Sequence, residues 1–441
     1  MQSGMNANSK DAEYLAASSA LDTLLLPRHR WYFIKEAFSP SLVDYAIKDT
    51  QCDKNDLVID AFCGSGTVPL TAALHGCKAL GFEVNPFLAF VSRTKLLQCR
   101  PYTIDKYLPE VINATTTGKP SPLATFSTFS EAGGAKKWLF NKDVLEAFEG
   151  GWKATVGLSL PIRDLLRLSL IGAAMDVCNA VKDGKCLRYR PDWQERSPGK
   201  QEFLDTFQKR VSEIKVDLEQ CPMRNLDANI LVTDSRNLRS NELNGRKFRL
   251  CVMSPPYLNS FDYTDIYRPE LFLGKFVSSN KGLKELRLRT LRSHVQVDWE
   301  KPKQMDMGQL FSSSLADIEK HADSLWNARI PSMIQAYFQD LKLVLGNLRE
   351  LAQENASVWI VVSTSAYAGV EIPVDLIIAD IGVQVGWLLR ELKVTHYLRR
   401  VPGQQWETLY EKRNKQPHLR ESVIIFDSKP QAKSTIIGVQ G

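Results

Sequence analysis

The feature that most constrains the fold is an apolar run that ends in a glycine-rich turn and continues as a helix. Residues 56–62 have the pattern of a buried strand, Gly64 and Gly66 follow it, and a helix is predicted from Thr67. Glycine allows a tight turn at the end of a strand, and a strand followed directly by a helix is the repeating unit of parallel sheets. The chain is therefore expected to contain an α/β domain.

Further apolar runs are compatible with strands of the same sheet. Helical patterns alternate with them at both ends of the chain, which favours a mostly parallel arrangement. Together with the first run they supply seven strands. The six further runs are 78–83, 229–234, 248–253, 357–363, 394–399 and 422–426.

Two long segments interrupt this pattern. An uninterrupted β–α unit needs far fewer residues than 101–226, so we interpret that segment as an insertion that begins as a loop and then becomes mainly helical. Residues 265–325, rich in Lys, Arg and Leu, form a second, basic insertion. The expected core is then discontinuous, 26–100 and 227–441, preceded by a flexible N-terminal tail, 1–25.

Composition excludes several classes of protein. The eight cysteines form no C-x-x-C pair and the six histidines are scattered, so we predict no metal site and a reducing, cytoplasmic location. No apolar run is long enough for a membrane span, and the polar N-terminus does not resemble a signal peptide. The net charge of +6 is compatible with a phosphate-bearing partner but does not require one.

The glycine-rich turn can be assigned a ligand class by elimination. A dinucleotide fingerprint needs a third glycine where Pro69 stands, and a Walker A motif needs a Gly-Lys-Ser/Thr sequence that is absent. A ligand without phosphates, such as S-adenosylmethionine, fits better. Glu83, at the end of the second strand, suits its ribose hydroxyls, and Asp234, at the end of the third, its adenine amino group. A turn that serves only the fold is the alternative.

The sequence Ser254-Pro255-Pro256-Tyr257 follows another predicted strand. Its two prolines make a rigid ledge, from which the Ser254 hydroxyl and the Pro255 carbonyl can accept both hydrogens of one amino group. The nitrogen lone pair is then directed at a methyl donor, and Tyr257 can stack on a base, which contributes about 1–3 kcal/mol. The alternative is a proline-terminated strand with a core tyrosine. Ligands bind at the carboxyl edge of open α/β sheets, where both motifs are expected.

These motifs resemble those of the DNA amino-methyltransferases. Residues 60–67, Asp-Ala-Phe-Cys-Gly-Ser-Gly-Thr, resemble the D-P-F-x-G-S-G-T cofactor motif of that family, with Ala61 in place of the usual proline. Residues 254–257 are similar to the catalytic motif, in the form most often linked to cytosine N4. The segments similar to those that bind ribose, adenine and the methionine end of the cofactor are 81–86, 233–236 and 38–40.

The resemblance, which covers residues 26–100 and 227–427, implies a Rossmann-like sheet of seven strands with helices on both faces and an antiparallel last hairpin. It also implies base flipping and direct methyl transfer, with catalytic residues Ser254, Pro255, Pro256 and Tyr257. The absence of any Pro-Cys dipeptide weighs against a cytosine C5 enzyme, and Cys63 is expected to be a small buried hydrophobe. The residues implied to bind S-adenosylmethionine are Phe38, Asp60, Phe62, Gly64, Ser65, Gly66, Thr67, Glu83, Asn85, Asp234 and Ser235.

The prediction is therefore a site-specific DNA methyltransferase, with cytosine N4 preferred over adenine N6. An RNA base methyltransferase, a protein glutamine methyltransferase and an inactive nucleic-acid-binding module are the alternatives. A partner restriction or defence-system protein is compatible with this function. The oligomeric state stays open.

Basic stretches suggest where nucleic acid binds. Phosphate contacts explain clusters of Lys and Arg, although a solvated face explains any single one equally simply. The run 281–303 is favoured because it follows Tyr257 closely in the sequence. The predicted contacts are Arg287, Arg289 and Arg292 from this run, and Arg399 and Arg400 from the stretch 397–420; the third basic stretch is 182–200.

Overall fold

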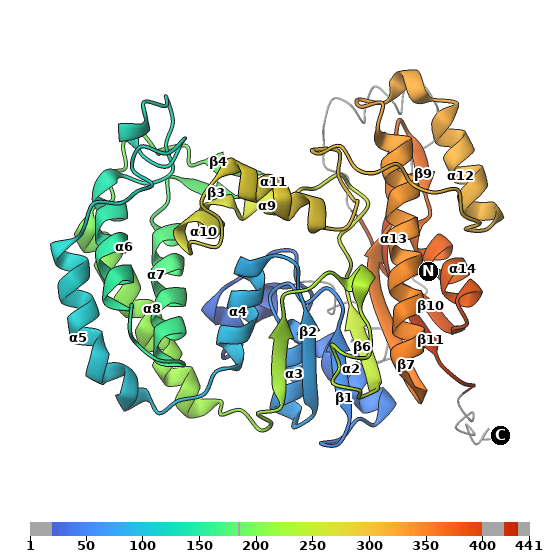
Figure 1. The fold of residues 1–441 in the computed structure, drawn as a ribbon, viewed down its shortest axis with the longest axis horizontal. Coiled ribbons are helices and arrows are strands. Elements are labelled where there is room, and N and C mark those ends of the chain that lie inside the picture. The colour runs from blue at the N-terminus through green and yellow to red at the C-terminus, as the bar shows by residue number, and fades with distance from the viewer. Residues whose placement is uncertain (1–19, 184–185, 399–418, 431–441) are drawn as a thin grey trace, which may run out of the picture.

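The computed structural model describes residues 20–183, 186–398 and 419–430, and its centre is a seven-stranded sheet (Figure 1). The strand order is β10-β11-β7-β6-β1-β2-β5. Only β11 runs antiparallel to its neighbours; the other pairings are parallel. The predicted seven-stranded, mostly parallel sheet is therefore confirmed. Its strands are β1 (Leu57–Asp60), β2 (Lys78–Phe82), β5 (Ala228–Leu231), β6 (Phe248–Met253), β7 (Ala352–Ser363), β10 (Leu388–Tyr397) and β11 (Arg420–Asp427).

Helices cover both faces because the strand side chains alternate between two apolar layers. In β1, Leu57 and Ile59 pack in the layer under α13 (Ile330–Leu351) and α14 (Val374–Gln384). Val58 packs on the opposite face, with α2 (Pro40–Thr50) and α3 (Thr67–His75). Successive strand residues point to opposite faces, so one apolar run supplies both layers.

The segment 101–226 forms a helical bundle beside the sheet, on the far side from α13 and α14 (Figure 1). The expectation that it begins as a loop is wrong, because a helix starts at Pro101, a residue favoured in the first turn, and buries Ile104 and Val111 at helical spacing. The loop comes later, between Thr117 and Lys142. The bundle helices are α5 (Pro101–Thr117), α6 (Lys142–Ala154), α7 (Ile162–Asp176) and α8 (Lys200–Gln220), with a small hairpin, β3 (Ala180–Lys182) and β4 (Leu187–Tyr189).

The first part of the second insertion, up to residue 289, lies across the carboxyl edge of the sheet, between the bundle and α13, whereas the helix 309–319 lies on the other side of α13 (Figure 1). Leu271, Phe272 and Leu283 join the same apolar cluster as the bundle, so the two insertions pack together although the core sequence separates them. The predicted basic run thus lies above the strand ends. This region contains α9 (Tyr263–Ile266), α10 (Arg268–Leu273), α11 (Asn280–Arg289), α12 (Gln309–Glu319) and the 3₁₀ turn η5 (Ala322–Ser324).

Several short elements lie outside the sequence predictions. Residues Ala20–Leu24, within the predicted tail, form the 3₁₀ helix η1, and the Ser39 hydroxyl donates a hydrogen bond to Asp22 in it. A second hairpin consists of β8 (Ser365–Tyr367) and β9 (Val370–Ile372). The 3₁₀ turns η2 (His29–Trp31), η3 (Glu131–Gly133) and η4 (Ser235–Asn237) are the other short elements. The helix α4 (Pro86–Leu96), which follows β2, starts at Pro86 as the alternating pattern of helices and strands predicts. Within the described ranges, no helix combines the length and the apolar character that crossing a membrane requires.

Candidate active site

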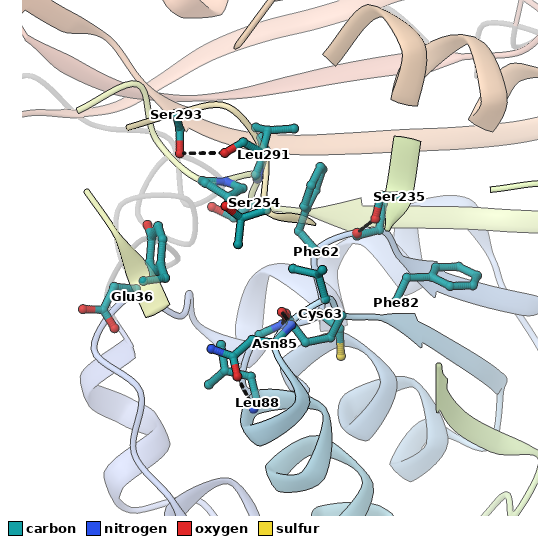
Figure 2. Close-up of a pocket in the computed structure, with 18 of the residues that line it drawn as sticks. Glu36, Phe62, Cys63, Phe82, Asn85, Leu88, Ser235, Ser254, Leu291 and Ser293 are labelled. Carbon is teal, nitrogen blue, oxygen red and sulfur yellow. Dashed lines mark hydrogen bonds between the residues drawn. The ribbon is translucent and has the colours of Figure 1, made fainter. Parts of the chain in front are cut away.

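A cavity opens at the edge of the sheet where β1, β2, β5 and β6 end (Figure 2). The strand order reverses at this point, since β2 and β5 lie on one side of β1 and β6 lies on the other. Open α/β sheets bind ligands in such a crevice. The space between the lining side chains, with the open mouth included, is about 1410 Å³.

Most of the predicted site residues line this one cavity. All four residues of 254–257 do so, and among the predicted cofactor residues only Asp60 and Gly66 do not. Gly66 supports the wall from behind: its φ is +82°, and a Cβ there would lie 2.9 Å from the Ser92 Cβ. The predicted cofactor residues that line the cavity are Phe38, Phe62, Gly64, Ser65, Thr67, Glu83, Asn85, Asp234 and Ser235.

The Glu83 carboxylate is held by the backbone of the glycine-rich turn. Its Oε2 accepts from the Gly64 N–H and its Oε1 from the Asn85 N–H, both at 2.8 Å. Each oxygen keeps a further acceptor position, which suits a pair of neighbouring hydroxyls. Burial raises the pKa of Glu83 to about 6, so the group is mostly ionised at neutral pH.

A second carboxylate lies under the same turn. Asp60 is 1% exposed and accepts from the Phe62 N–H at 2.9 Å. Burial raises the pKa of Asp60 to about 8, and the negative charge of Glu83 acts in the same direction. Within the described part of the chain, neither Asp60 nor Glu83 forms an ion pair with a lysine or arginine. Buried carboxylates without a cation are costly, and they cluster at functional sites.

Asp234 caps the 3₁₀ turn η4 and is heavily hydrogen-bonded. It accepts from the backbone N–H of Arg236 at 2.9 Å and from the Nε–H and Nη2–H of the same residue, at 3.0 and 2.6 Å. Three N–H groups therefore occupy a carboxylate that has about four acceptor positions. The Nε–H is shared between the two oxygens at 3.0 Å each, so a donor in the cavity can replace one of its two contacts.

Ser254 and Tyr257 face the cavity from the end of β6. Figure 2 shows Ser254 on the same side as Leu291 and Ser293, with Asn85 and Leu88 on the other side. The Tyr257 hydroxyl donates to Glu421 Oε2 at 2.9 Å, which fixes the orientation of its ring from β11. Burial raises the pKa of Tyr257 well above its ordinary value, so this hydroxyl stays protonated.

A second group of lining residues was missed from the sequence. These residues come from the stretch 259–267, which leads into the second insertion, and from the basic run. They include two aromatic rings, Phe261 and Tyr263, that meet edge to face at 4.6 Å. The sequence did contain one signal for this part of the site, since three aromatic residues lie close together within Phe261–Tyr267. The missed lining residues on this side are Asn259, Phe261, Tyr263, Thr264, Tyr267, Thr290, Leu291, Ser293 and His294.

Lys95 was also missed, because a buried lysine has no signature in the sequence. It lies on α4 behind the glycine-rich turn, 2% exposed, and its Nζ donates to the backbone oxygens of Ser65 at 3.2 Å and Tyr32 at 3.0 Å. Burial lowers the pKa of Lys95 to about 7. It ties the turn to the N-terminal segment that carries Phe38.

The predicted phosphate-binding arginines differ in their surroundings. Arg287 pairs with Asp262 at 2.6 Å and Arg292 with Asp340 at 2.6 Å, both partners being almost fully buried. These two guanidinium groups therefore support the fold, which weighs against phosphate contacts. Arg289 is exposed, lines the cavity and has no ion pair within the described residues. The predicted contacts Arg399 and Arg400 lie outside the described residues.

The comparisons identify relatives over most of the chain. It is 25% identical over 413 residues to the type II methyltransferase M.BsoBI of Geobacillus stearothermophilus, covering 81% of this chain and 78% of that protein. It is 24% identical over 415 residues to the type II methyltransferase M.AvaI of Nostoc, covering 83% and 80%. The family resemblance predicted from the motifs is confirmed by these relatives.

Comparisons with family models and with solved structures do not extend this result. No family model matches the chain. Among solved structures, the rRNA methyltransferase aviRa from Streptomyces viridochromogenes aligns over 96% of this chain and 94% of its own, at 11% identity. The TM-score of 0.29 is too low to indicate a shared fold.

Proposed function

We propose that this chain, a relative of type II methyltransferases, transfers a methyl group from S-adenosylmethionine to the exocyclic amino group of a flipped DNA base. The observation that carries this proposal is the presence of two features on one cavity. Glu83 provides a negative floor without a cationic partner among the described residues. Ser254 and Pro255 provide two acceptors at the neighbouring strand end.

The residues present fit S-adenosylmethionine, whose sulfonium supplies an electrophilic methyl group when it is bound. The free acceptor positions of Glu83 suit the two ribose hydroxyls. The position on Asp234 that the shared Nε–H of Arg236 can give up suits the adenine amino group. The ionised Glu83 carboxylate also offsets a positive charge in a water-poor site, where such attraction is strong. Phe38 and Phe62 supply apolar walls.

The chain's contribution to the transfer is to prepare the amino group. Conjugation with the ring leaves the nitrogen lone pair of a base unavailable. When the Ser254 hydroxyl oxygen and the Pro255 carbonyl accept its two hydrogens, the nitrogen is drawn toward a tetrahedral shape and its lone pair is freed. Proximity and oriented dipoles carry catalysis of this kind. Tyr257, held by Glu421, supplies a ring on which the flipped base stacks.

Cytosine N4 is the preferred target because the motif has the Ser-Pro-Pro-Tyr form. Adenine N6 is the second candidate, since its exocyclic amine is similar to that of cytosine. DNA is preferred over RNA because the relatives are type II methyltransferases, a class that works with restriction enzymes. An inactive binding module is disfavoured by the intact Glu83, Asp234 and Ser254.

The test is mass spectrometry of nucleosides after incubation of the protein with labelled S-adenosylmethionine and mixed-sequence DNA or RNA. We expect label in N4-methylcytosine from DNA, and none with the Ser254→Ala variant. Label only in N6-methyladenine would replace the base, and label only in RNA would replace the substrate class. No label in either, with a folded protein that binds the cofactor, would contradict the enzymatic function.

A further inference from the structure

We infer that Arg236 is a positioning residue that couples cofactor binding to the opposite wall of the cavity, where the target base would lie. That wall is the segment 289–294, of which Arg289, Thr290, Leu291, Ser293 and His294 line the cavity. This inference rests on the proposed function, because it takes Asp234 as the acceptor for the cofactor's adenine. Arg236 itself does not line the cavity, so it acts only through its neighbours.

On the cofactor side, Arg236 determines where the Asp234 carboxylate points. Its guanidinium Nη2 lies 2.6 Å from Asp234 Oδ2, and its Nε lies 3.0 Å from each carboxylate oxygen. Together with the Arg236 backbone N–H, these contacts place two donors on each oxygen, so a ligand donor takes a position that the shared Nε–H gives up. A donor that takes this position therefore acts on a carboxylate already shared with Arg236.

On the target side, the same guanidinium reaches the segment 289–292. Its Nη2 donates to the Arg289 carbonyl at 3.2 Å, and its Nη1 lies 3.1 Å from Asp340 Oδ2. Asp340 in turn accepts from the Arg292 backbone N–H at 3.1 Å and pairs with the Arg292 guanidinium at 2.6 Å. Both ends of the four-residue stretch are thus bound, directly or through Asp340, to Arg236.

The network is buried and balanced in charge. Asp340 is 1% exposed on α13, and the side chains of Arg236 and Arg292 are 17% and 12% exposed. Two arginines face two aspartates, so a change in the contacts of one member changes the pairing of the others. Arginine stays charged at all physiological pH values, so the link persists across them.

The expected consequence is cooperative binding of cofactor and nucleic acid. A bound adenine would fix the side chains of Asp234 and Arg236, and Arg236 would then hold the wall 289–294 in place. Binding of the target base would therefore cost less conformational entropy, because the wall is already ordered. Coupling between two ligands is reciprocal, and factors of about 5 to 150 are usual. The wall should therefore become more protected when the cofactor site alone is filled.

The first test measures amide hydrogen exchange with and without S-adenosylhomocysteine, which lacks the transferable methyl group. In the wild type, S-adenosylhomocysteine should slow exchange in residues 289–296 by about fivefold or more, the lower end of usual coupling. In Arg236→Gln, protection around the glycine-rich turn should persist while protection of 289–296 disappears. Arg246→Gln is the matched control: it removes another arginine from an ion pair, with Asp227 at 2.9 Å, next to the opposite end of β5.

The second test measures affinity for a mixed-sequence DNA duplex with and without S-adenosylhomocysteine. The ratio of the two affinities should fall to about one in Arg236→Gln, and Arg236→Lys, which cannot form the fork, should restore it only in part. Two results would overturn this inference but not the proposed function. One is a ratio of affinities in Arg236→Gln equal to that of the wild type. The other is a wild type that binds S-adenosylhomocysteine without slower exchange in residues 289–296. A wild type that does not bind S-adenosylhomocysteine would overturn the proposed function as well.

Discussion

Replacing Glu83 with Gln tests the cofactor site most directly. The carboxylate now accepts one backbone N–H on each oxygen and has one position free on each. In the Gln variant an amide NH₂ group replaces one carboxylate oxygen. This NH₂ group points at a backbone N–H, which is also a donor, and it cannot accept a hydrogen bond from a ribose hydroxyl. A hydrogen bond to a charged group contributes about 1.5–3 kcal/mol, so the affinity for S-adenosylmethionine should fall about 10- to 150-fold.

The same residue predicts a pH dependence. Burial raises the pKa of Glu83 to about 6 in the free protein, and a cationic ligand that donates to the carboxylate favours its ionised form. The pKa in the complex is then lower than in the free protein, so affinity should be constant well above pH about 6 and fall as the pH drops through it. Glu83→Gln should not show this fall.

Calorimetric titration with S-adenosylmethionine between about pH 5 and 8 measures both effects. Glu421→Gln is the matched control, because this carboxylate contacts Tyr257 on the target side and its loss should leave cofactor affinity nearly unchanged. Wild-type affinity in Glu83→Gln would show that ribose does not bind at Glu83. If the affinity of the wild type for S-adenosylmethionine does not fall near pH 6, the Glu83 carboxylate does not control binding in the way proposed.

Four further outcomes are expected. Ser254→Ala should slow methyl transfer by roughly 10²–10³ in a labelled-methyl assay, while cofactor affinity stays within about twofold, because the hydroxyl contacts only the base. Arg289→Ala should lower the slope of log affinity against log salt by about 0.9 for duplex DNA without changing the melting temperature. Arg292→Ala should instead destabilise the fold by about 3–5 kcal/mol in urea titrations, since it leaves a buried carboxylate partly unpaired. Gly66→Ala should cost at least about 1 kcal/mol of folding free energy, because its φ is +82° and the new Cβ would contact the side chain behind it; a wild-type urea midpoint would contradict this reasoning.

The sequence predicted the features that depend on local order. Strands were found because their apolar runs are buried on both faces, and the glycine-rich turn and Ser254–Tyr257 because each is contiguous in the sequence. The far wall of the cavity was missed because it depends on tertiary contacts: Arg236 and Asp340 are 104 residues apart. The same limit explains Arg287 and Arg292, whose positive charges were visible in the sequence while their buried partners were not.

The contact between Tyr257 and Glu421 joins residues 164 positions apart, and it has a consequence for the timing of synthesis. Glu421 belongs to β11, which pairs between β7 and β10 although it is the last of the three to be made. While a chain is still emerging from the ribosome, Tyr257 therefore lacks its acceptor and the sheet lacks an inner strand. The site is therefore complete only after β11 has been made, has left the ribosome and has paired, so a chain stalled before Glu421 should methylate nucleic acid poorly, as nucleoside analysis of stalled chains can establish.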